Sequence, residues 1–208
     1  MKTIFKSLAV FILLLVTLGP RQAAASTNVY QYKREGAQAD LFSVDASGCV
    51  TTWIWIFTGE QIYHNPQNPD FAYSMVEIYI NQQDTCKNMG FGGYADELIS
   101  PSDLKIDGGL NTATLSTTVD LINTDTQEIT PLSIHLTWTA MSPIRSETNH
   151  FRYSFAGTHI NRKADQAFRY ARVTGTLSDG ITNYLTENAV GDARIFNAKE
   201  GEISISPE

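Results

Sequence analysis

Apolar and polar residues alternate over two neighbouring stretches of this chain, residues 112–123 and 132–139. Almost every second residue of each stretch is apolar, and Thr124-Asp125-Thr126 follows the first stretch as a turn signal. A period of two is typical of β-strands with one buried and one solvated face. The pattern therefore predicts an antiparallel hairpin and excludes an amphipathic helix, which needs a period near 3.6 residues.

Shorter strand patterns separated by turn signals occur along the rest of the chain. We expect hairpins at residues 41–58 and 168–185, and a further strand at residues 151–159. Two Asn-Pro steps predict a loop at residues 59–70, and one helical turn is expected within residues 96–103. Helical periodicity is sustained nowhere. The chain is therefore predicted to be all-β, an antiparallel β-sandwich of about ten strands, with a β-barrel as the alternative.

The first 25 residues have the three-part pattern of a secretory signal peptide. Lys2 and Lys6 make a basic start, residues 8–16 are all apolar, and Ala23-Ala24-Ala25 offers small residues for cleavage. The apolar run is shorter than the 20 or so residues that a membrane span needs. We expect residues 1–25 to be removed on export, and residues 26–208 to form a single secreted domain, since no linker-like segment divides them.

Charge narrows the class of protein further. The predicted signal carries three of the 15 basic residues and none of the 22 acidic ones, so 12 basic residues remain against 22 acidic and the net charge changes from −7 to −10. Such a balance excludes nucleic-acid binding through bulk positive charge. Aromatic residues make up 11 % of the chain, which excludes a disordered protein.

Cys49 and Cys86 are the only cysteines of the chain. In an exported protein an even pair most simply forms one disulfide, and that is the prediction. Two separate buried thiols are the alternative. A zinc site is not expected, because neither cysteine has a histidine or a third cysteine at ligand spacing.

Aromatic residues lie at even spacings along three predicted strands, with Met75 and Glu77 between Tyr73 and Tyr79 in one of them. Each set would share one face of its strand, and the sets are Trp53/Trp55/Phe57, Phe71/Tyr73/Tyr79 and Phe151/Tyr153/Phe155. Two interpretations stay open: the rings fill the core, or they form an exposed platform for a glycan or a peptide. The second makes Trp53, Trp55 and Tyr73 candidate ligand contacts. Tyr63 and His64, in the predicted loop, are two more.

Residues 145–172 are basic within this acidic protein. They carry six basic residues against Glu147 and Asp165, a net charge of +4. Arginine binds carboxylates and phosphates through paired hydrogen bonds, so a cluster of this kind can mark an anion site, although most clustered charges are simply solvated. The candidates taken from this segment are Arg152, Arg162, Lys163 and Arg169.

Local signatures of catalysis are missing from the sequence. No GxSxG, HExxH or phosphate-binding loop occurs, and no motif indicates a metal or a cofactor. The leading hypothesis is a secreted, non-enzymatic binding or interaction module for a glycan, a surface polymer or another protein. The alternatives are a secreted hydrolase whose site is assembled only in the fold, and a self-assembling surface protein that pairs through edge strands. Oligomeric state stays open.

Overall fold

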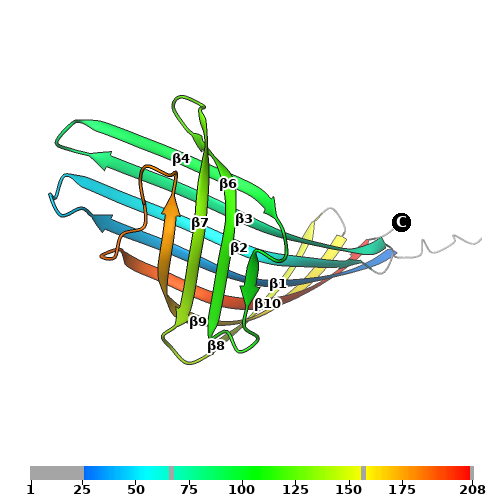
Figure 1. Ribbon diagram of the computed structural model, residues 1–208. Coiled ribbons are helices and arrows are strands. Elements are labelled where there is room, and N and C mark those ends of the chain that lie inside the picture. Colours follow the sequence, from blue (N-terminus) through cyan, green and yellow to red (C-terminus); the bar gives the residue numbers. More distant parts are fainter. Residues whose placement is uncertain (1–25, 66–67, 156–157, 207–208) are drawn as a thin grey trace, which may run out of the picture.

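The computed structural model describes residues 26–65, 68–155 and 158–206, so the predicted signal peptide lies outside the described residues. Within these ranges the chain forms ten strands and no helix (Figure 1). They are β1 (Ser26–Val44), β2 (Val50–Asn65), β3 (Asn68–Asp84), β4 (Met89–Ile99), β5 (Leu104–Ile106), β6 (Thr112–Asn123), β7 (Ile129–Ala140), β8 (Arg145–Phe155), β9 (Thr158–Ser178) and β10 (Val190–Ser206). The predicted all-β fold of about ten strands is confirmed.

All the pairings between these strands are antiparallel, and the strand order closes on itself, because its first strand, β10, also pairs with β9 near its other end. The path runs β10-β1-β2-β3-β4-β6-β7-β9, and β9 pairs with β10 again, while β8 and the short β5 are side branches. β10, β1, β2, β3 and β4 form one layer, which β6, β7 and the second half of β9 face (Figure 1). The two layers are thus joined at both sides, through the β4–β6 and β9–β10 pairings.

The hydrophobic core lies between these two layers. Both contribute side chains that are almost fully buried, including Ile54, Ile56, Val76, Ile78, Leu115, Leu132, Ile134, Leu136 and Trp138. Trp138 of β7 also bridges the layers, since its indole N–H donates to the Gln38 carbonyl of β1 at 3.1 Å. Burying these large side chains stabilises the fold by roughly 1.5–3 kcal/mol each relative to full exposure.

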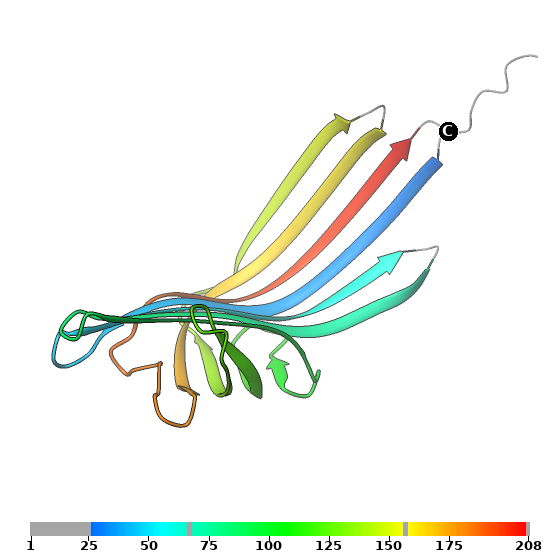
Figure 2. The same cartoon turned by 90° about the horizontal axis from the view of Figure 1, so that it is seen from above.

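Several strands continue far beyond this core. In Figure 2, β8, β9, β10, β1, β2 and β3 project together from the two-layered part as a single sheet, which we call the extended sheet. Its pairings include Tyr32 with Glu200 and with Tyr63. β8 is exposed on both faces, at all ten positions from Arg145 to Ser154. The extended sheet therefore presents two faces and two edges to solvent.

Four local predictions are wrong. Residues 59–70 belong mostly to β2 and β3, and Pro69 lies between the pairs Tyr63–Phe71 and Asn65–Asn68, where the β2–β3 register shifts and proline is tolerated. Residues 96–103 contain the end of β4 and a turn, without a helical turn. The predicted strand 151–159 spans the change from β8 to β9, and residues 181–185 form a loop with one isolated bridge, Ser178 to Asn183.

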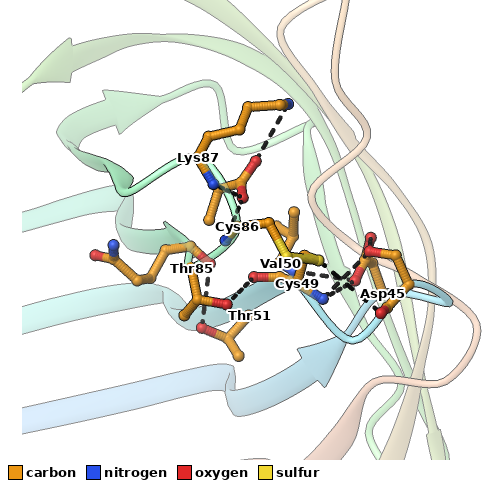
Figure 3. The surroundings of a disulfide bond; sticks show 10 residues. Asp45, Cys49, Val50, Thr51, Thr85, Cys86 and Lys87 are labelled. Carbon is orange, nitrogen blue, oxygen red and sulfur yellow. Dashed lines mark hydrogen bonds and ion pairs between the residues drawn. A yellow bond between two sulfur atoms is a disulfide. The ribbon is translucent and has the colours of Figure 1, made fainter.

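Cys49 and Cys86 form the predicted disulfide, which links the β1–β2 turn to the β3–β4 turn (Figure 3). Backbone hydrogen bonds hold both turns: the Cys49 and Val50 N–H groups donate to Asp45 Oδ1, each at 3.0 Å, and the Thr85 N–H donates to the Cys49 carbonyl at 2.9 Å. A disulfide fits an oxidising compartment. The described part of the chain holds no helix that is long and apolar enough to cross a bilayer.

Candidate functional site

One set of aromatic side chains lies on the outer side of β1–β4, opposite the core. Because Ile54 and Ile56 point into the core, the alternating residues Trp53, Trp55 and Phe57 point outward. Their neighbours across the sheet complete the surface that we call the aromatic face: Phe42, Trp53, Trp55, Phe57, Tyr79 and Tyr94. Phe42 is 46 %, Trp53 38 % and Tyr79 42 % exposed. The rings are therefore neither core nor free in solvent: they pack on the sheet and keep a solvent-facing side.

Two glycines allow part of this surface to lie flat. Gly36 and Gly59 are opposite each other on β1 and β2, and Gly36 is also opposite Phe196 of β10. A Cβ on Gly36 would be 2.7 Å from Phe196 Cζ, and one on Gly59 would be 3.3 Å from Phe57 Cζ. The two rings thus cover the space that side chains would fill. Phe57 is nearly parallel to Trp55, at an interplanar angle of 13°, and stacks on Phe196 at 29°.

Carboxylates are placed around these rings. Asp40 Oδ1 accepts a hydrogen bond from Trp53 Nε1 at 2.6 Å, which fixes the indole. Asp40 is opposite Asp192, and Glu77 is opposite Asp96, so like charges face each other across neighbouring strands. Within the described residues none of these four carboxylates forms an ion pair. Like-charged pairs of this kind destabilise a sheet.

The electrostatic effect of these carboxylates can be seen at Tyr79. The charge of Glu77, and to a smaller extent that of Asp96, raises the pKa of the Tyr79 phenol. The phenolate is disfavoured because the local potential is negative. The same potential favours polar hydrogen atoms and cationic groups over anions at this surface.

A second aromatic group continues along the same side of the extended sheet. Tyr63 of β2 lies between Tyr32 of β1 and Phe71 of β3, with the Tyr32 and Tyr63 ring centroids 5.1 Å apart. Tyr73 follows, 5.4 Å from Phe71. From Trp53 to Tyr63 the strand advances ten residues, or about 33 Å at the usual rise. The predicted contacts Trp53, Trp55, Tyr63 and Tyr73 therefore share one side of one sheet.

His64 lies apart from that group. It alternates with Tyr63 along β2 and so points to the other side of the sheet. There its ring nitrogen contacts the carboxylate of Asp70 on β3. The structure thus places His64 with an acidic partner, away from the aromatic face.

The four basic candidates do not converge on one site. Arg162 forms an ion pair with Glu200 at 2.5 Å, and Lys163 forms one with Asp165 at 2.7 Å on the opposite face of β9. Arg152 lies opposite Asn161, near the far end of the extended sheet. Arg169 points toward loops: its guanidinium donates to the Ser142 carbonyl at 2.6 Å, to the Gly109 carbonyl and to Asn111 Oδ1. Of the six basic side chains in residues 145–172, Arg162 and Lys163 thus form ion pairs, and Arg169 is held by neutral acceptors.

Groups that could carry hydrolysis are sparse in the described part of the chain. Ser116 Oγ contacts His135 Nδ1 at 2.9 Å, and Ser154 Oγ contacts His159 Nδ1 at 2.7 Å. A catalytic triad also needs a carboxylate that orients the imidazole, and within the described residues neither His135 nor His159 has such a partner. The described residues hold no group of three or more His, Cys, Asp or Glu side chains suited to a metal ion.

Sequence reasoning missed several residues of the aromatic face and of the Gly36–Gly59–Phe196 row beside it. Phe42, Tyr94 and Phe196 stand alone in their strands, without an aromatic residue two positions away. Gly36 and Gly59 are 23 positions apart in the sequence and become neighbours only through the β1–β2 register. A search for single aromatic residues two positions from a charged residue would have found all three, which lie near Asp40, Asp96 and Arg194 respectively, but not the register that brings them together.

Comparisons with known proteins identify no family and one weak structural similarity. No protein-family model matches the chain, and no curated protein matches it. Among solved structures, a "putative AttH" from Nitrosomonas europaea is similar, with 10 % sequence identity and a TM-score of 0.25. The alignment covers 87 % of this chain and 52 % of that protein, so the chain spans about half of its length. A similarity this weak supports no argument about function.

Proposed function

We propose that this protein is an exported, non-enzymatic module that binds a polysaccharide chain on its aromatic face. The observation that carries the proposal is the group of outward rings on one sheet, with Trp55 and Phe57 nearly parallel at 13°. A sugar ring presents flat faces of C–H groups, and aromatic faces cover such apolar area at a low cost in side-chain entropy. Export is supported by the signal-like residues 1–25 and by the disulfide.

The carboxylates suit the hydroxyl groups of a sugar. Asp40, Glu77 and Asp96 surround the rings and can accept hydrogen bonds from hydroxyl or amino groups at the edge of a stacked sugar. Asp40 already accepts from Trp53, so the ring beside it is fixed before a ligand arrives, which lowers the cost of ordering on binding. A neutral or amine-bearing glycan fits this surface. A polyanion would be repelled by it.

The length of the surface favours a polymer over a free sugar. The aromatic side chains of β2 alone are spread over about 33 Å, and the rings around Tyr63 and Tyr73 extend the face onto the extended sheet. A single sugar would contact one or two rings. A linear chain lying along β2 would contact both groups, and its affinity would grow with chain length until the face is covered.

A binding panel tests the proposal. Insoluble cellulose and chitin, a soluble neutral β-glucan and the anionic polymer pectin are incubated with the protein, with serum albumin as the reference. We expect at least one of the three neutral polymers to bind and pectin to bind more weakly. Binding of none of them above the albumin level would contradict the proposal.

Variants then locate the site. Trp55→Ala removes the most central ring, and we expect at least a tenfold loss of affinity, as the contact area of a large apolar side chain is worth roughly 1.5–3 kcal/mol. Ile181→Ala is the matched control, because Ile181 is apolar, 96 % exposed and lies in the loop after β9. Equal affinity of the two variants would place the ligand elsewhere.

A further inference from the structure

A second feature of the fold, separate from the aromatic face, is a cleft between β9 and β10. The two strands pair from His159 with Ile205 to Tyr170 with Arg194, and beyond that point they separate. The cleft that opens there has a volume of about 1200 Å³ and is lined by the second half of β9, the start of β10 and residues 183–189 of the loop between them. Leu41 and Leu185 contribute buried apolar side chains to its lining.

Backbone groups of β9 face this cleft. In an antiparallel strand the N–H and C=O of one residue point to the same side, and successive residues alternate. The backbone groups of Tyr170 are directed toward β7 and β8, because its C=O accepts from the Met141 N–H at 2.7 Å and its N–H donates to Ser142 Oγ at 2.9 Å. Ala171 and Val173 alternate with Tyr170 along the strand, so their backbone N–H and C=O groups are directed into the cleft.

At both ends of the cleft, the cleft-facing backbone groups of β9 already have hydrogen-bond partners. The backbone groups of Leu177 are directed to the same side as those of Val173, and the loop after β9 supplies their partners. The Leu177 N–H donates to Asn183 Oδ1 at 3.1 Å, and its C=O accepts from the Tyr184 N–H at 2.8 Å. At the other end β10 takes over, with Ile195 opposite Arg169. Between these ends the described residues offer no strand partner to the cleft side of Ala171 and Val173.

The opposite wall of the cleft, formed by β10, also directs backbone groups into it. The backbone groups of Ile195 are directed toward β9, so those of Ala193, two residues earlier on β10, are directed into the cleft. Gly175 and Gly191 flank the opening with φ of +129° and +154°, and a Cβ on either would be 1.9 Å from a carbonyl oxygen of the neighbouring strand. Both positions therefore need glycine. The two strand walls therefore expose backbone groups beside the small residues Ala171, Ala193 and Gly191.

We propose that an extended peptide segment of a partner protein binds in this cleft as an added strand. A peptide strand alternates N–H and C=O groups toward both sides, and the cleft presents unpaired backbone to it from β9 and from β10. The volume exceeds the 300–1,000 Å³ or so that is typical of small-molecule pockets, which also favours a chain. Ala171, Ala193 and Gly191 on the two strand walls leave room for side chains of the added strand.

The experiment selects binders from a phage-displayed library of random linear heptapeptides on the immobilised full-length protein. We expect enriched peptides to slow hydrogen exchange at the Ala171 and Val173 amides at least tenfold. N-methylation of alternate residues of such a peptide should weaken its binding roughly two- to tenfold per hydrogen bond lost. The variant Val173→Pro, which removes one cleft-facing N–H, should bind the same peptide more weakly.

Three results would overturn the inference: no enriched peptide, an enriched peptide that leaves exchange at Ala171 and Val173 unchanged, or N-methylated peptides that bind as well as their parents. Slowed exchange at these amides on raising the concentration of the protein alone would also overturn it, since a second copy would then be the occupant. The exchange and N-methylation measurements use the unmodified protein. They therefore decide the question even if Val173→Pro fails to fold.

Discussion

Substitution of Gly36 by alanine tests how the aromatic face is held. The new Cβ would lie 2.7 Å from Phe196 Cζ and 2.7 Å from the Thr58 carbonyl oxygen. The phenyl ring can move, but the carbonyl belongs to a paired strand and has little freedom. Overpacking of this kind costs about 1–3 kcal/mol, and the lower backbone entropy of the unfolded alanine chain offsets about 0.4–1 kcal/mol. At the midpoints of these two ranges, about 2 and about 0.7 kcal/mol, the net loss of stability is about 1.3 kcal/mol.

Gly201→Ala is the matched control for this substitution. Gly201 also lies within β10–β1 pairing, opposite Gln31, and a Cβ there meets nothing within 4 Å. The same chemical change should therefore be neutral or stabilise by up to about 1 kcal/mol. Urea unfolding of both variants measures the difference, with an unchanged m-value as the sign that only stability has changed.

Gly36→Ala should also weaken ligand binding, because displacing Phe196 disturbs Phe57, whose ring centroid is 6.0 Å away. In thermal unfolding the loss of stability corresponds to a melting temperature lower by roughly 2–8 °C for a chain of this size. Equal unfolding midpoints for Gly36→Ala and Gly201→Ala would refute the argument that Phe196 occupies the space above Gly36.

Three further predictions concern the scaffold. Cys49→Ser should lower the free energy of unfolding by about 4 kcal/mol in urea, since the bridge spans a sequence separation of 37 residues; an unchanged midpoint would contradict this. Arg169→Lys should cost about 1–3 kcal/mol and speed hydrogen exchange in residues 109–111, because one ammonium cannot reach all three acceptors of the guanidinium; unchanged exchange would show that the loop does not depend on it. Burial alone would raise the pKa of Asp179, but the Thr182 N–H and the Tyr184 hydroxyl outweigh it and hold that pKa below its ordinary value. A lowered pKa in the folded state contributes stability at neutral pH that is lost as the pH falls below about 4, so Asp179→Asn should flatten the fall in urea midpoint between pH 5 and 3; an equally steep fall in the variant would contradict the assignment.

The two-layered part of the fold could be predicted from sequence because its strands have one wet face. In β6 and β7 the buried and exposed positions alternate as the apolar and polar residues do. The extended sheet gave no such signal. β8 is exposed on both faces, so its residues show no period, and the single strand predicted at residues 151–159 joins the end of β8 to the start of β9. The two Asn-Pro steps indicate a loop where β2 ends and β3 begins, but Pro69 is accommodated within β3, beside a shift of the β2–β3 register.

The candidate site was only half predictable for a related reason. Period two places Trp53, Trp55 and Phe57 on one face, but Ile54 and Ile56 make the other face equally apolar, so the pattern does not say which face is buried. The choice depends on what lies opposite. Asp40, which faces outward beside Trp55, and the Gly36–Gly59–Phe196 row are long-range features of strand register.

The most direct test of the aromatic face uses the three tryptophans of the chain. Trp53 and Trp55 lie on that face, whereas Trp138 is fully buried between the layers and serves as an internal control. The indole N–H signals are followed by NMR while a polysaccharide identified in the binding panel is added. The account predicts that the Trp53 and Trp55 signals shift together and saturate, with the Trp138 signal unmoved. Saturable binding that leaves the Trp53 and Trp55 signals in place would contradict it.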